Sequence, residues 1–415
     1  TWGGGLLEGG CGVVQYNGYP TVEWRGGFEN IGSRGARLLE NIQGLDATFS
    51  RTNGSEFVLH GNKGDSTTPD SYEPFQITLR PSSVDNFSPL SYSGKSSSGP
   101  KGWPYYNLQM PGGGMVMAIG WLGEWASSFV RDGGNNLRVQ AGQQLTHLVL
   151  EPGEKIRTPL IAMMFWQGAD VVRSQNIWRR WYMAHEIPRV DDQPPAPVTQ
   201  IQVGGNDINS VKAFIQVGIK PDICWRDAGG AYTWYPNYNG PYKGDDSWLN
   251  TGTWEVDPRR YPNGFKPFSD WIHAHGMKFL LWFEPERVGD PHSWLGVNHP
   301  EWLLPGEVHG KDAITSNDSN LHASNQGNTH GLILNEGDPA ALKWLTNHIE
   351  GLIISNGIDW YREDMNGDGP LRGWRNHDAT NRQGITENLY IQGHLAYWDA
   401  LLAMNPGLRI DSCAS

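Results

Sequence analysis

The sequence predicts a multidomain chain in which an N-terminal all-β super-sandwich is followed by a (β/α)8 TIM-type barrel. Three observations support this fold class. At 415 residues the chain is too long for one ordinary core. Short alternating strands fill its first part, whereas strands that alternate with helices fill its last part. We expect a sandwich over residues 1–172, a linking helix and Pro-rich linker over 173–197, and an incomplete barrel over 198–415.

The expected sandwich rests on short runs of β-forming residues. Residues 21–24, 57–60 and 75–79 are β-branched or alternating, and turns rich in Gly, Asn, Ser and Pro separate them. This pattern is typical of an all-β domain.

A change of period marks the end of the sandwich. Val172, Ile177, Trp178 and Trp181 recur near helical spacing, so a helix is expected over 173–185. Residues 191–197 then bring three prolines, which cannot pair into a sheet. This stretch is the natural domain boundary.

The last part of the chain reads as βα units. Continuous apolar strands joined by helical crossovers indicate a parallel sheet that is buried on both faces. We expect strands at 199–203, 222–227, 277–284, 332–335, 358–364 and 408–413, and helices at 208–217, 265–275, 339–355 and 386–404. The chain would then hold about five or six of the eight strands of a barrel, as part of a longer protein.

Two points of this assignment stay open. An open doubly wound sheet is the rival architecture, although no GxGxxG motif follows a strand, which counts against dinucleotide binding. The run 332–335 has no evident helix between residue 284 and itself. It is either a barrel strand or a hairpin within a long loop.

Composition excludes several classes of partner. The chain has 32 Lys+Arg against 44 Asp+Glu and a formal charge of -12, which disfavours nucleic acid and anionic membranes. No apolar run is long enough to span a bilayer. Cys11, Cys224 and Cys413 allow at most one disulfide and form no zinc motif, so neither a metal nor a cofactor is expected. The compartment, cytoplasmic or secreted, stays open.

Polar residues close the expected barrel strands. The strand ends read 225–227, 282–286, 362–366 and 411–413, and active sites of βα barrels lie at such ends. Arg362, Asp364 and Asn366 alternate along one strand and should share a face. A guanidinium beside a carboxylate favours the ionised form, so Asp364 suits a nucleophile. A purely structural Arg–Asp pair is the alternative.

Residues 364–369 also begin like a calcium-binding EF-hand loop. The twelfth position, however, is Arg375 in place of the bidentate Glu, and a strand in place of a helix precedes the loop. The pattern therefore does not predict a calcium site.

Taken together, the strand ends resemble the melibiase-type α-galactosidases of glycoside hydrolase family 36. The stretches that carry the resemblance are residues 27–43, 118–121, 174–181, 227–229, 252–254, 261–265, 276–286 and 358–366. The resemblance implies a retaining exo-α-galactosidase that releases terminal α-galactosyl residues from oligosaccharides without a cofactor. It also implies Asp364 as the nucleophile and a sugar pocket formed by Asp227, Trp282, Arg362, Asn366 and Cys413.

The resemblance has departures that bear on specificity. Arg362 stands where the family usually has Lys, Glu363 where it has Trp, and Ala228 where many members have a second Asp. By the resemblance, the acid/base is an Asp in a Gly-rich stretch beyond Ser415, so residues 1–415 alone are expected not to turn over substrate.

Two other functions stay open. The same scaffold could serve an α-N-acetylgalactosaminidase or a galactosyl transferase, or a non-catalytic carbohydrate-binding protein. The sandwich is expected to contribute either a pocket loop or a homo-oligomer contact, and its sequence does not choose between them.

Overall fold

The computed structural model of this protein forms two compact units. It describes residues 2–4, 6–52, 54–66, 68–89, 96–189, 193–203, 208–228, 233–236, 251–289, 291–305, 332–365 and 370–413. The first unit consists of Thr1–Arg189 and Trp374–Ile391, and the second of Val190–Gly373 and Gln392–Ser415. Among the described residues, no helix combines the length and apolar character that a membrane span needs.

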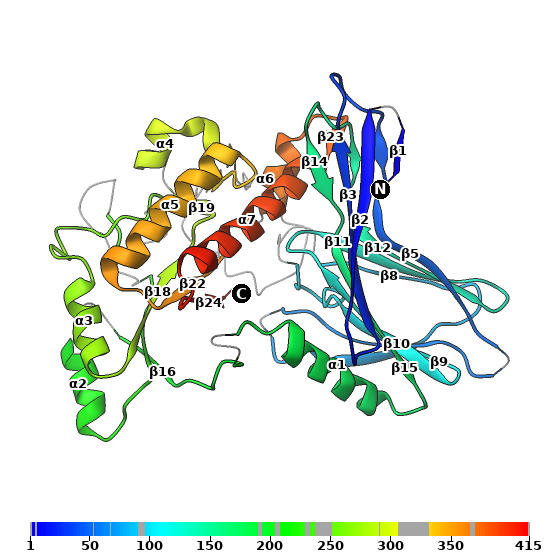
Figure 1. The fold of residues 1–415 in the computed structure, drawn as a ribbon, viewed down its shortest axis with the longest axis horizontal. Coiled ribbons are helices and arrows are strands. Elements are labelled where there is room, and N and C mark those ends of the chain that lie inside the picture. Colours follow the sequence, from blue (N-terminus) through cyan, green and yellow to red (C-terminus); the bar gives the residue numbers. More distant parts are fainter. Residues whose placement is uncertain are drawn as a thin grey trace. The chain divides into compact units, whose positions relative to one another are not determined.

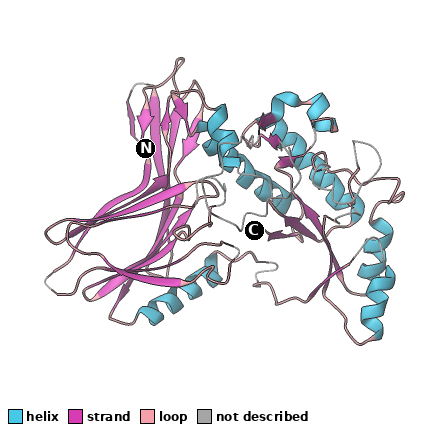
Figure 2. Ribbon diagram, turned by 180° about the vertical axis from the view of Figure 1, so that it is seen from behind, coloured by secondary structure: helices cyan, strands magenta, loops and turns pink. Residues whose placement is uncertain are grey.

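The first unit is built from antiparallel sheets (Figure 2). A nine-stranded sheet runs β1-β2-β3-β15-β10-β9-β6-β7, with β14 paired to β3. Its strands are β1 (Trp2–Gly4), β2 (Leu7–Gln15), β3 (Thr21–Asn30), β6 (Val58–Asn62), β7 (Pro74–Thr78), β9 (Tyr105–Met110), β10 (Gly113–Gly120), β14 (Lys155–Arg157) and β15 (Leu160–Gln167).

Two smaller sheets complete this unit. The four-stranded sheet β5-β12-β11-β8 contains β5 (Gln43–Ser50), β8 (Val84–Phe87), β11 (Trp125–Arg131) and β12 (Asn136–Gln143). The three-stranded sheet β23-β13-β4 contains β4 (Leu39–Glu40), β13 (His147–Leu148) and β23 (Arg382–Gln383). Because β23 comes from late in the chain, residues 374–391 become part of this unit.

Aromatic side chains join the nine-stranded and four-stranded sheets. Phe87 of β8 stacks on Phe75 of β7 with ring centroids 5.7 Å apart. Tyr106 of β9 meets Phe129 of β11 at 5.3 Å. Along β11 every second residue is buried, which is the period of a strand with one face on a core. The alternating runs in the sequence therefore supply the apolar layer between the sheets.

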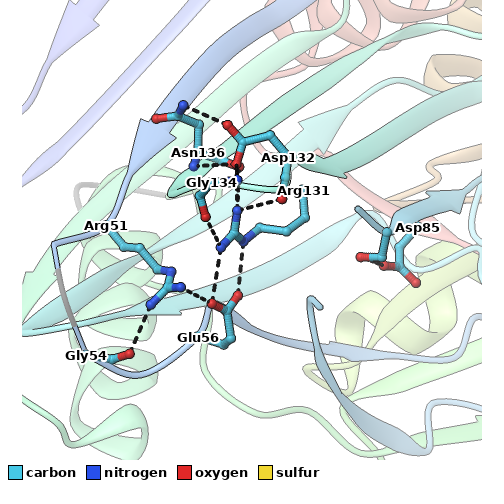
Figure 3. Close-up of polar contacts among 9 residues, drawn as sticks. Arg51, Gly54, Glu56, Asp85, Arg131, Asp132, Gly134 and Asn136 are labelled. Atoms are coloured by element: carbon cyan, nitrogen blue, oxygen red, sulfur yellow. Dashed lines mark hydrogen bonds and ion pairs between the residues drawn. The ribbon is translucent and has the colours of Figure 1, made fainter. Parts of the chain in front are cut away.

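A buried arginine closes the β11–β12 turn (Figure 3). Arg131 is 1% exposed, and its Nε and Nη2 donate to the two carboxylate oxygens of Glu56 at 3.0 and 3.2 Å. Its Nη1 donates to Asp132 Oδ1 at 2.7 Å, and its Nη2 also donates to the carbonyl of Gly134 at 2.6 Å. Loss of either partner would leave a buried charge without compensation, so the role of Arg131 here is structural.

Helix α1 (Val171–His185) follows the sheets, close to the predicted range 173–185. Asp170 caps it by accepting a hydrogen bond from the Arg173 amide at 2.9 Å. Ile177 and Trp178 pack against a buried cluster that includes Met164 of β15. The linking helix thus lies on the nine-stranded sheet.

The second unit contains a five-stranded parallel sheet in the order β16-β17-β18-β22-β24. The strands are β16 (Gln200–Gln202), β17 (Ile223–Arg226), β18 (Lys278–Phe283), β22 (Trp360–Glu363) and β24 (Arg409–Ser412). In Figure 1 they run from green to red with helices beside them. Five expected strands form this parallel sheet, and closure into a (β/α)8 barrel stays a prediction.

Helices contribute buried side chains to the core of this sheet. They are α2 (Ile208–Gln216), α3 (Lys266–Ala274), α4 (Trp294–Asn298), α5 (Pro339–Asn356) and the later part of α7 (Ile385–Met404). A 3-10 turn (Pro300–Trp302) follows α4, and α6 (Pro370–His377) ends within the first unit. Phe268 of α3, Leu345 of α5 and Leu401 of α7 lie in one buried cluster with Phe279 of β18. The four expected helices are present, whereas the sequence analysis missed α4 and α6.

The run 332–335 lies outside the parallel sheet. It forms β21 (Leu332–Leu334), which pairs antiparallel with β19 (Arg287–Val288) and with β20 (Leu303–Pro305). The barrel-strand interpretation of this run is therefore wrong, and the small antiparallel element is right. The physical reason is the pairing, because Ile333 has an antiparallel partner on each side, Arg287 of β19 and Leu304 of β20, so both edges of the run are engaged outside the parallel sheet.

Candidate active site

The register of the parallel sheet brings the polar strand ends into rows. Trp282 of β18 lies opposite Arg362 of β22, and Arg362 lies opposite Asp411 of β24. Residues in register on parallel strands point to the same face, and Asp364 and Cys413 are two positions further along. The described strand-end residues of the predicted site, apart from Asp227, thus belong to two neighbouring rows at one edge of the sheet.

Asp364 is held by its neighbours on β18. The indole Nε1 of Trp282 donates to Asp364 Oδ2 at 3.0 Å, and Trp282 is only 1% exposed. The Asp364 amide donates to the carbonyl of Phe283 at 3.0 Å, while Asp364 Oδ1 accepts from the Met365 amide at 2.9 Å. Both carboxylate oxygens therefore have a fixed direction before any ligand binds.

Arg362 has a different ion-pair partner from the one expected. Its Nη1 lies 2.7 Å from Asp411 Oδ2, and its guanidinium lies 4.5 Å from the ring centroid of Trp225. That the Arg362 guanidinium also keeps Asp364 ionised stays a prediction. Asp411 is a site residue that the sequence analysis missed, and its place two residues before Cys413 on one strand was the available signal.

Cys413 lies next to Asp364. Its amide donates to the carbonyl of Glu363 at 2.6 Å. Burial raises the pKa of the Cys413 thiol, and the negative charge of Asp364 raises it further. A thiol with a raised pKa stays neutral near pH 7, so it suits a contact role at the site better than a nucleophilic one.

Asp227 lies at the same edge, after β17, but is held separately. Its Oδ1 accepts from the Ala228 amide at 2.7 Å, and its Oδ2 accepts from Gln202 Nε2 at 3.3 Å. Tyr235 is 1% exposed and within electrostatic reach of Asp227 and Glu284. The predicted sugar contact Asn366 lies outside the described residues.

Glu363 points away from this face, which corrects its expected influence on the sugar pocket. It is 4% exposed, and its Oε2 accepts from the Tyr361 hydroxyl at 2.6 Å and from Trp398 Nε1 of α7 at 3.0 Å. Neighbouring residues on a strand face opposite ways, so a side chain next to Asp364 must face the helices. The substitution at this position therefore alters the packing behind the strand.

One group of potential metal ligands occurs among the described residues. Glu286, Glu363 and His394 offer atoms that all lie within 4.8 Å of one another. His394, however, has one ring nitrogen 2.7 Å from Glu336 Oε2 and the other 2.9 Å from Glu363 Oε1. With both nitrogens engaged by carboxylates, the imidazole has no lone pair to offer an ion.

Comparison with known proteins gives one family and a consistent set of relatives. Residues 236–415 match the Melibiase family model. Alpha-galactosidase 2 of Pediococcus pentosaceus is 30% identical over 182 residues, which cover 44% of this chain and 22% of the relative. An alpha-galactosidase of Escherichia coli is 28% identical over 302 residues, which cover 72% of this chain and 38% of the relative.

A solved structure extends the likeness to the fold. The GH36 alpha-galactosidase AgaA of Geobacillus stearothermophilus, in complex with 1-deoxygalactonojirimycin, superposes with a TM-score of 0.73 at 18% identity. The match covers 99% of this chain and 54% of that one. The chain thus spans about half of this structural neighbour and less of the two curated relatives.

Proposed function

We propose, from the match of residues 236–415 to the Melibiase family model, that this protein is a retaining exo-α-galactosidase with Asp364 as nucleophile. The substrate class is terminal α-galactosyl residues of oligosaccharides. The observation that carries the proposal is the placement of Asp364 at the carboxyl end of β22, with its carboxylate oriented by the indole of Trp282.

The proposed reaction is a double displacement. A carboxylate oxygen of Asp364 forms a bond to the anomeric carbon while the bond to the leaving oxygen breaks, and a second carboxyl group protonates that oxygen. The second group, now a carboxylate, then accepts a proton from water as the water oxygen attacks the glycosyl-enzyme, which releases the sugar with retained configuration and frees the Asp364 carboxylate. The acidic group that donates the proton would lie about 5 to 5.5 Å from Asp364.

The neighbouring side chains have distinct proposed roles. The Trp282 indole holds Oδ2 of Asp364 and the Met365 amide holds Oδ1, so that the carboxylate would be fixed in its direction toward the sugar. The ion pair of Arg362 with Asp411 would present a rigid guanidinium to sugar hydroxyls. Asp227, Asn366 and Cys413 complete the proposed pocket.

The test is covalent trapping with a fluorinated galactosyl fluoride. Fluoride leaves without protonation, so labelling requires only the nucleophile. Mass spectrometry of peptides should place the sugar on Asp364. Asp364→Asn should eliminate labelling because an amide is a poor nucleophile. Asp399 is exposed on α7, so the control variant Asp399→Asn should be labelled to the same extent as the parent protein.

Other outcomes identify other functions. Labelling of a different residue, or full labelling of the Asp364→Asn variant, would overturn the assignment of the nucleophile. Faster trapping by N-acetylgalactosamine-configured reagents would favour an α-N-acetylgalactosaminidase. Transfer of the trapped galactose to an added sugar in preference to water would indicate a galactosyl transferase. Binding without labelling would indicate a carbohydrate-binding protein.

A further inference from the structure

We infer that His394 is a positioning residue for Asp364, acting as an imidazolium held between Glu336 and Glu363 on the opposite side of β22. The inference deepens the proposed function, because it rests on Asp364 being the nucleophile. It concerns three buried side chains that no step of the proposed reaction uses.

Glu363 provides the link to the nucleophile. It precedes Asp364 directly, and its carbonyl accepts the Cys413 amide at 2.6 Å. The two residues share a peptide bond and point to opposite faces of the strand. Whatever holds the Glu363 side chain against the helices therefore also sets the position of the Asp364 backbone.

Both carboxylate oxygens of Glu363 have partners among the buried side chains. Its Oε2 takes hydrogen bonds from Tyr361 and Trp398, and the Tyr361 hydroxyl in turn accepts from the Tyr397 hydroxyl at 2.9 Å. Its Oε1 faces His394 Nε2 at 2.9 Å. A carboxylate that accepts hydrogen bonds at one oxygen can only accept at the other oxygen as well. The contact at Oε1 therefore needs a donor, so Nε2 of His394 carries a hydrogen.

The second ring nitrogen meets a second carboxylate. His394 Nδ1 lies 2.7 Å from Oε2 of Glu336, which is 0% exposed. His394 itself is 6% exposed. Among the described residues, no lysine or arginine pairs with Glu336 or Glu363. The imidazolium thus supplies one positive charge that these two buried acids share.

The packing of α7 leaves little room for rearrangement. Gly393 precedes His394, and a Cβ atom at this position would overlap the carbonyl oxygen of Glu336. The helix backbone therefore touches the segment that carries Glu336. His394 ties three elements together, namely α7, the end of β22 and the connection between β21 and α5.

The electrostatics agree with a charged ring. Burial by itself lowers the pKa of His394, but the charges of Glu363 and Glu336 outweigh it and raise the pKa well above its ordinary value. Burial raises the pKa of Glu336, while the charge of His394 acts against that rise. The ionisable groups around the ring are Glu336 before α5, Tyr361 and Glu363 on β22, Tyr397 on α7 and, in the metal-ligand group above, Glu286 after β18.

The first experiment measures the charge state of the ring. Nitrogen-15 NMR of the histidines should show both nitrogens of His394 protonated at pH 7, with no titration between pH 5 and 8. His394→Gln identifies the signal. A ring that titrates near 6.5, or that is neutral at pH 7, would overturn the inference. Stoichiometric uptake of Zn²⁺ or Mn²⁺ that Glu286→Gln abolishes would also overturn it.

The second experiment measures trapping of Asp364 by the fluorinated galactosyl fluoride. In His394→Gln, we expect the maximal inactivation rate constant to fall at least about tenfold, while the concentration for half-maximal rate changes less than about threefold. A neutral amide cannot serve both carboxylates, so the strand end shifts while the sugar contacts remain. His348→Gln on α5, where the ring contacts the backbone carbonyl of Trp254, should behave like the parent protein.

The outcomes separate the two proposals. Thermal unfolding of each variant, run alongside, shows that the protein is folded at the assay temperature. An unchanged inactivation rate in His394→Gln, with normal labelling of Asp364 in the parent, would overturn only the positioning role. A fall in the inactivation rate constant that only matches the fall in the folded fraction would also overturn the positioning role alone. Absence of label on Asp364 in the parent would overturn both proposals.

Discussion

Glu387 shows how burial governs a single side chain. It lies in the first unit, where its Oε1 accepts from Trp121 Nε1 at 2.9 Å and from the Glu124 amide at 2.8 Å. Its Oε2 is buried and has no hydrogen-bond partner among the described residues. Burial raises the pKa of Glu387 to about 7, although these hydrogen bonds act to lower it. The folded protein therefore keeps this carboxyl group protonated over a pH range where the unfolded chain loses the proton.

The raised pKa predicts a pH dependence of stability. Between pH about 4.5 and about 7 the folded state binds more protons at Glu387 than the unfolded state, so the free energy of unfolding falls as the pH rises. The loss should be on the order of a few kcal/mol. Denaturant unfolding at pH 5 and pH 7.5 measures it. Glu387→Gln should show a smaller fall over this interval, and an identical fall in both proteins would contradict the assignment.

Helix α5 shows how local chemistry defines an element. Asp338 caps its start by accepting from the amides of Ala340 and Ala341 at 2.7 and 3.1 Å, and Pro339 occupies the first turn. Gly357 ends the helix with a left-handed φ of 63°. This backbone conformation is strained for any residue that has a Cβ atom. Both signals are visible in the sequence, so this helix was predicted well.

Two glycines of this helix should respond to alanine with opposite signs. At Gly357 a Cβ atom would lie 2.7 Å from the hydroxyl of Ser269, and the positive φ adds strain. Gly357→Ala should therefore lower stability by at least about 1 kcal/mol. At Gly351 nothing lies within 4 Å, so Gly351→Ala should raise stability by up to about 1 kcal/mol. Denaturant unfolding checks the pair, and effects of the same sign would contradict this account.

At the scale of the whole molecule, the chain crosses between its units more than once. Residues 374–391 return to the first unit, although residues on either side belong to the second. Arg382 holds this return, because it donates to both carboxylate oxygens of Glu154 at 2.5 and 2.6 Å and to the carbonyl of Val149 at 2.7 Å. Helix α7 thus begins in one unit and carries His394 in the other.

Arg382→Gln should loosen this returning segment. Losing a bidentate, partly exposed ion pair and a carbonyl contact should lower the stability of the segment by about 1 kcal/mol. Hydrogen exchange should accelerate in β13 and β23 and leave β18 unchanged. Arg138→Gln, which removes a more exposed bidentate pair with Asp46, is the matched control and should leave β23 unchanged. Equal exchange of β23 in parent and Arg382→Gln would refute the role.

The sequence by itself indicated the strands of the parallel sheet and the long helices, and it singled out Asp364 as the proposed central carboxylate. Strand and helix periods, the caps of α5 and the polar strand ends are local signals, so they indicated the parallel strands and placed Asp364 at the end of one. Alternation along β22 also implied that Arg362 and Asp364 share a face.

Only the tertiary structure decided which side chains meet. Arg362 could pair with any carboxylate on its face, and the register with β24 selected Asp411. Glu363 was expected to shape the sugar pocket, yet it faces α7 and His394. Residues 374–391 likewise belong to the first unit, where Arg382 forms an ion pair with Glu154, which is far away in the sequence. Such pairings depend on strand register and helix packing, which arise from contacts between distant segments and leave no local pattern in the chain.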